Sequence, residues 1–109
     1  MTVKEFSEKY NLKYLSQGDD REITGGFCGD LLSWVMANAR EGHAWFSVMG
    51  NINAVAVASL NEVACLVLCQ GSALNPDAAK RAEMEGINIL STDLDCFALA
   101  GMLYNDLKA

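Results

Sequence analysis

The sequence predicts one α/β domain, a three-layer structure in which a mainly parallel sheet of about five strands carries helices on both faces. Two observations lead to this prediction. From residue 43 onward, short apolar segments alternate strictly with helical patterns, as in parallel sheets with crossover helices. Residues 64–69 are continuously apolar, which is typical of a strand buried on both faces. A length of 109 residues suits a single domain spanning residues 1–109.

The expected elements follow one another with short connections. They are a helix over residues 2–10, a strand at 12–15, a turn at 17–20, a strand or loop at 22–28, a helix at 30–40, a strand at 43–49, a helix at 52–60, a strand at 64–69, a helix at 75–86, a strand at 87–90 and a helix at 94–107.

Local signals define the elements of the first half of the chain. The residues after Met1 form the capping-box pattern T-x-x-E, which starts a helix. The adjacent Gly25 and Gly26 allow positive φ and close backbone approach, so a strand next to a tight loop is expected there. Asp30 is expected to cap the following helix, whose apolar residues recur at the 3.6-residue period. Gly42 is the expected stop signal.

In the second half, residues 52–60 could be either a strand or a buried helix. Their alanine content favours a helix, and a helix there lets the flanking strands run parallel. Asn75 and Pro76 occupy the cap and first-turn positions of the next helix, which Gly86 ends. Residues 91–93, Ser-Thr-Asp, are expected to cap the final helix.

Loops that follow parallel strands are the place where a ligand is expected. The carboxyl ends of parallel strands share one edge of the sheet, and helix N-termini there offer unpaired N–H groups. The same residue types also serve simply as caps and turn formers, and this alternative stays open for each one. The ligand candidates in these loops are Asn51, Asn53, Gln70, Gly71, Ser91 and Thr92, and the edge is expected to lie beside the paired glycines.

The net negative charge of the chain argues against two classes of partner. The chain has 8 basic and 14 acidic residues, a net charge of −6, and no basic cluster, which disfavours nucleic acid and anionic membranes. A small phosphorylated ligand or a nucleotide remains compatible, since backbone N–H groups can hold phosphate. No signal peptide and no membrane span is recognised, so a cytoplasmic location is expected.

No catalytic or metal-binding pattern is present. The phosphate-loop, dinucleotide and nucleophile-elbow motifs are missing, and His43 is interpreted as structural. The four cysteines lack zinc-site spacing and are expected to be free thiols, mostly buried. We therefore expect no cofactor, no metal and no catalytic residues.

Residues 20–26, Asp-Arg-Glu-Ile-Thr-Gly-Gly, resemble the signature Asp-Arg-x-Val-Thr-Gly-Gly of the DRTGG domain family. The resemblance continues through residues 29–33, 53–58 and 89–92, so it covers nearly the whole chain. It implies a compact α/β domain similar to the N-terminal domain of HPr kinase/phosphorylase, with a regulatory and often dimer-forming role. The kinase activity of such relatives is not implied, because the chain lacks a phosphate loop.

Carried onto this sequence, the family motif falls on five residues that become ligand-binding candidates. They either contact a ligand or only build the turn, and both interpretations stay open. They are Asp20, Arg21, Thr24, Gly25 and Gly26.

The final helix is apolar nearly all round, whereas a surface helix needs only one apolar stripe. A homodimer is therefore expected, with Leu99, Met102 and Leu103 as interface candidates. Trp34, one position off the apolar stripe of its own helix, is a further candidate.

These observations predict a stand-alone, non-enzymatic regulatory domain that senses a small ligand. The alternative is a protein-interaction module without a small-molecule ligand, which docks a partner enzyme through the apolar final helix.

Overall fold

The computed structural model describes all residues from 1 to 109 and places five strands in one sheet, in the order β1-β5-β4-β3-β2. Strands β2, β3, β4 and β5 run parallel, and β1 is antiparallel to β5. The elements in chain order are α1 (Val3–Lys9), β1 (Lys13–Ser16), β2 (Gly25–Cys28), α2 (Leu32–Asn38), β3 (His43–Ser47), α3 (Ile52–Leu60), β4 (Cys65–Leu68), α4 (Pro76–Glu85), β5 (Ile89–Ser91) and α5 (Cys96–Lys108).

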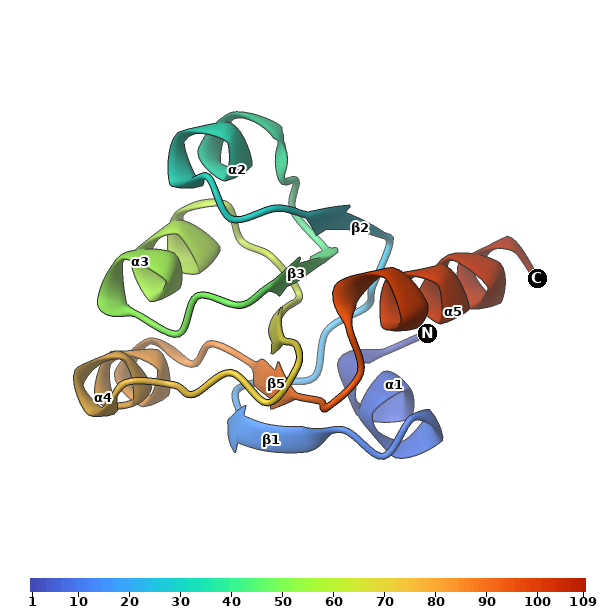
Figure 1. Ribbon diagram of the computed structural model, residues 1–109, viewed down its shortest axis with the longest axis horizontal. Helices are drawn as coiled ribbons and strands as arrows, with labels where there is room; N and C mark the ends of the chain where they lie inside the picture. Colours follow the sequence, from blue (N-terminus) through green and yellow to red (C-terminus); the bar gives the residue numbers. More distant parts are fainter.

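Helices cover both faces of the sheet, which confirms the predicted three-layer α/β architecture (Figure 1). Helices α1 and α5 cover one face, and α2, α3 and α4 cover the other. Neighbouring residues of β3 alternate between the two layers: Phe46 packs with α1 and α5, whereas Trp45 packs with the other three helices. The central strand β4 is buried along its whole length, as its continuously apolar sequence predicts.

Two predicted helix caps are wrong. Asp30 does not cap α2; its carboxylate accepts hydrogen bonds from Ser47 Oγ and from the backbone N–H of Val48 at 3.0 Å, so it ties the loop after β2 to the end of β3. Helix α2 begins after Leu31 without a side-chain cap and ends at Asn38. The final helix is capped by Asp95, whose carboxylate accepts from Ala98 N at 2.8 Å, and not by residues 91–93.

The apolar final helix is also packed differently from the expectation. Leu99 and Leu103 are 0% and 2% exposed, because they fill the core under α5. They are therefore core residues, and their assignment as interface residues is wrong. No helix of the structure combines the length and the apolar character needed to span a membrane.

Candidate functional site

The three loops predicted to converge lie on one edge of the sheet. Ser47, Leu68 and Ser91 pair with one another across β3, β4 and β5, so the segments that follow them leave the same edge. Backbone hydrogen bonds join these loops directly: Gly71 N donates to Thr92 O at 2.9 Å, and Asn75 N donates to Gly50 O at 2.7 Å. The convergence is confirmed.

Many polar groups of this edge are engaged within the domain. Asn51 caps α3 by accepting from Ala54 N at 2.9 Å. Gln70 and Gly71 form a turn with positive φ, which brings Gly71 against Thr92. Asn53 and Gln70 are exposed, while Ser91 and Thr92 line a shallow polar hollow of about 460 Å³ beside Lys13.

The paired glycines lie at the other end of the sheet. Gly25 pairs with His43, the first residue of β3, and Thr24 N donates to Gly42 O at 2.9 Å. Because β2 and β3 run parallel, the start of β2 belongs to the amino edge, whereas the three loops follow strand ends. The prediction that the glycines adjoin the polar loops is therefore wrong.

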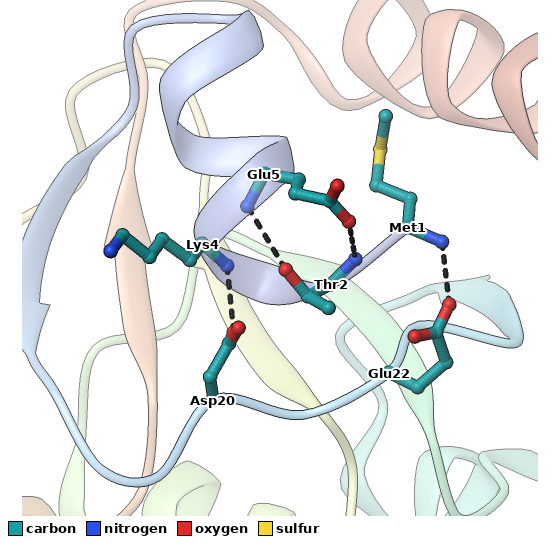
Figure 2. A network of polar contacts seen from close by, with 6 residues as sticks. All are labelled: Met1, Thr2, Lys4, Glu5, Asp20 and Glu22. Atoms are coloured by element: carbon teal, nitrogen blue, oxygen red, sulfur yellow. Dashed lines mark hydrogen bonds and ion pairs between the residues drawn. The ribbon is translucent and has the colours of Figure 1, made fainter.

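The first half of the motif fastens α1 to the rest of the domain (Figure 2). Asp20 accepts a hydrogen bond from Lys4 N at 2.9 Å, in the first turn of α1. Arg21 O accepts from Val3 N at 2.9 Å, and its guanidinium donates to Val63 O at 2.9 Å. These contacts correspond to the turn-building interpretation of Asp20 and Arg21.

The second half of the motif lines an open groove. Thr24, Gly25 and Gly26 form one side of it, where β2 is the edge strand, and α5 forms the other. The groove measures about 630 Å³. Its complete lining is Thr24, Gly25, Gly26, Cys28, His43, Phe46, Phe97, Ala100, Gly101, Leu103, Tyr104, Leu107 and Lys108.

Small residues on both sides keep the groove open. A Cβ at Gly26 would lie 3.3 Å from Ala44 O and 3.5 Å from the Phe46 ring, at the bottom of the groove. On the opposite side, a Cβ at Gly101 would meet no atom within 4 Å. Two aromatic side chains of the same helix stand free beside this gap, Phe97 at 91% and Tyr104 at 64% exposure.

The imidazole of His43 lies against Gly25, on the face of the sheet that Phe27 and Trp45 share. Its Nδ1 accepts from Arg40 N at 3.2 Å, so in the neutral imidazole the proton resides on Nε2. Partial burial, and secondarily the charge of Arg40, lower the pKa of His43 and favour this neutral form. Nε2 has no partner in the protein and lies against Gly25, where a Cβ would be only 3.2 Å away.

Three of the four thiols, Cys28, Cys65 and Cys69, are poor nucleophiles in this fold. Burial raises the pKa of Cys65 to about 12, and burial, with the nearby Cys96, raises the pKa of Cys69. Burial also raises the pKa of Cys28, the exposed thiol of the groove. No three metal-ligating side chains come together, and no nucleophile, base and orienting group meet in the groove.

The sequence interpretation missed the α5 side of this groove. The residues concerned are Phe97, Gly101, Tyr104 and Lys108, which recur every three or four positions and so share one helix face. A glycine inside an otherwise apolar helix was the available signal, because such a glycine weakens the helix unless something requires the space.

Comparison with known proteins gives one matching family, and 4 chains of solved structures match the fold. The model of the DRTGG domain matches residues 35–105, so the matched region begins after the motif itself. No curated protein sequence matches the chain significantly.

One of the matching structures is a crystal structure of the CBS and DRTGG domains of the regulatory region of Clostridium perfringens pyrophosphatase, complexed with activator, diadenosine tetraphosphate. It superposes with a TM-score of 0.70 at 11% sequence identity. The alignment covers 93% of this chain and 45% of the matched one, so this chain corresponds to less than half of that regulatory region.

Proposed function

The chain belongs to the DRTGG domain family, and from this premise we propose that it is a non-enzymatic regulatory domain that senses a small ligand, either a nucleotide or a phosphorylated metabolite. In the similar pyrophosphatase, domains of this kind form part of a regulatory region whose activator is a nucleotide. The observation that carries the proposal is the groove of about 630 Å³, which three motif residues line. Ligand pockets are typically ~300–1,000 Å³.

A thermal-shift panel tests this function. The panel contains AMP, ATP, diadenosine tetraphosphate, a sugar phosphate and, as control, sodium chloride at matched ionic strength. A ligand present at about 100 times its Kd stabilises a fold by ~2.7 kcal/mol, which raises Tm by several degrees in a domain of this size. If no member of the panel raises Tm above the salt control, the sensing function is refuted for these compound classes.

The homodimer remains part of the proposal, with a smaller set of residues. Trp34 and Met102 are 62% and 39% exposed, so both are available to a second copy. Size-exclusion chromatography with light scattering tests the pairing. A dimer mass that falls to the monomer mass in Trp34→Asp supports it, and a monomer mass in the unchanged protein contradicts it.

A second candidate function is a protein-interaction module. The 91% exposure of Phe97 favours it, since a large apolar side chain left in water is a common feature of docking surfaces. Under this alternative Phe97→Asp abolishes capture of a partner protein, while the ligand panel leaves Tm unchanged.

A further inference from the structure

We propose that the groove between β2 and α5 is the ligand site of this domain and that it takes a small anion with a flat apolar body, whose acidic head lies at the amino end of β2. This inference rests on the proposed sensing function and names the place and the ligand class. The two sources of such chemistry are a nucleotide, with its base as the body, and an aromatic carboxylate.

The two ends of the groove differ because α5 runs antiparallel to β2. Cys28 ends β2 at the carboxyl edge of the sheet, and α5 starts at the same edge because it follows β5, which runs parallel to β2. The opposite end of the groove therefore combines the start of β2, at Thr24 and Gly25, with the last turns of α5, at Tyr104 and Lys108.

The polar groups gather at this second end. Thr24 supplies a hydroxyl group from an exposed position, and Lys108 supplies an ammonium group, which lies 5.2 Å from the centre of the Tyr104 ring. A hydroxyl donor and a cation, with no carboxylate in the lining, suit an anionic head.

The residues that line the groove also favour a negatively charged ligand. The chain has 14 acidic residues, yet none of them lines the groove. A neutral apolar ligand would not require this exclusion, and a cationic ligand would require the reverse.

The middle of the groove suits a flat body. Gly26 and Gly101 face it from opposite sides without side chains, and Phe46 forms the floor. The free rings of Phe97 and Tyr104 flank the same space and can stack on an inserted ring. The open space in the middle of the groove thus depends on two glycines in different elements.

Two pairs of probes, each matched in shape, distinguish the contribution of the acidic head to binding from that of the flat body. The pairs are 1-naphthoate with 1-naphthalenemethanol, and AMP with adenosine, titrated while the backbone amide signals of the ¹⁵N-labelled protein are followed by NMR. We expect the anion of at least one pair to bind ~10-fold more tightly than its neutral partner, a difference close to the weaker end of the range for one charge-assisted hydrogen bond. The bound anion should also shift the amide signals of Gly25, Gly26 and Gly101.

Variants locate the site. Gly101→Leu fills the gap and is expected to abolish binding, whereas Asn105→Leu, on the same helix but outside the groove, leaves it unchanged. Thr24→Val keeps the shape of the side chain but removes the hydroxyl group, and Lys108→Met removes the cation; each is expected to weaken binding of the anion ~5-fold or more. Unchanged amide spectra away from the substitution verify the fold of each variant.

The possible outcomes distinguish an error in the ligand site from an error in the sensing function. Nucleotide binding that shifts residues 50–53, 70–72 and 91–93 instead of the groove overturns this inference and leaves the sensing function standing. Equal affinity for a neutral and an anionic probe overturns the acidic head. If none of the four probes binds the groove, the inference fails, and the thermal-shift panel decides the function independently.

Discussion

Arg21 donates a hydrogen bond from its guanidinium to the backbone carbonyl of Val63, at 2.9 Å, and thereby joins the segment before β2 to the turn before β4. The two residues are 42 positions apart in the sequence. Arg21, the second residue of the family motif, is thus bonded within the domain, and it belongs to the part of the motif that contacts α1.

Replacement of Arg21 by methionine is expected to affect stability and not ligand binding. The change keeps an apolar stem but removes the donor, and a hydrogen bond from a charged group contributes about 1.5–3 kcal/mol before partial exposure reduces it. We expect a loss of about 1–2 kcal/mol in denaturant unfolding. Arg40→Met, at an exposed arginine whose side chain has no bonded partner, is the control and should change stability by less than about 0.5 kcal/mol. A stable Arg21→Met that no longer binds ligand contradicts this division of the motif.

Asn88 is expected to be the most sensitive polar residue of the core. It is 3% exposed, and its amide donates to Asp19 O at 2.8 Å and to Ala64 O at 3.2 Å while its oxygen accepts from Gly18 N at 2.7 Å. Asn88→Leu leaves these backbone groups without partners, so we expect a loss of about 3 kcal/mol, measured by urea unfolding. Asn105→Leu at an exposed position should be nearly neutral, and equal effects of the two changes would contradict the role of Asn88.

Two glycine-to-alanine changes are expected to have opposite signs. A Cβ at Gly50 would lie 2.0 Å from Ala73 O, a backbone atom that cannot move alone, so Gly50→Ala should lower stability by about 2 kcal/mol or more. A Cβ at Gly101 meets nothing, so Gly101→Ala should raise stability by up to about 1 kcal/mol, the usual difference between these residues in a helix. Thermal unfolding of both variants checks the prediction, which fails if Gly101→Ala is destabilising.

His43 is expected to make the fold less stable in acid. Its pKa in the folded state is lowered below 6.5, so the unfolded chain takes up the proton first as the pH falls. The stability is complete above the unfolded pKa and decreases as the pH falls through the folded value. The charge that faces the imidazole is that of Arg40, which disfavours the protonated form. Between about pH 7.5 and pH 5, the free energy of unfolding of His43→Gln should therefore decrease less than that of the unchanged protein. An NMR titration that gives a folded pKa above 6.5 would contradict the argument.

The cysteines are expected to react slowly with a disulfide reagent near neutral pH. Raised pKa values keep Cys28, Cys65 and Cys69 as thiols, and the thiolate is the reactive form. Cys28 is the exposed one of the three and should react first, at a rate that increases with pH. Cys28→Ser removes this phase. The half-buried Cys96 is removed in a second variant, and a fast phase that survives Cys28→Ser combined with Cys96→Ser would contradict the assignment.

The sequence allowed the architecture to be predicted because its signals are local. The buried run of β4 and the alanine-rich helix after β3 each indicate their own structure, and alternation then leads to a parallel sheet. Caps were less predictable. Asp30 and Asp95 are both aspartates near a helix start, and only their distance from Ser47 or Ala98 in three dimensions decides which one caps.

The candidate site was only half predictable. Residues 24–26 stand out in the sequence, but their neighbours on α5 lie more than 70 positions away along the chain. No spacing rule connects Gly26 to Gly101. The edge on which the glycines lie also depends on the direction of β2 in the sheet, and the sequence carries no local signal for that direction.

The two helical layers are built from different parts of the chain. Val3 and Phe6 of α1 share a core with Leu99 and Leu103 of α5, whereas the opposite layer takes its helices from the segment between them, α2 to α4. During synthesis that opposite layer can assemble early, while the face beneath α5 stays open to water until α5 has left the ribosome. A nascent chain stalled before Cys96 should therefore attract chaperones and be cleaved by protease, and the emergence of α5 should end both.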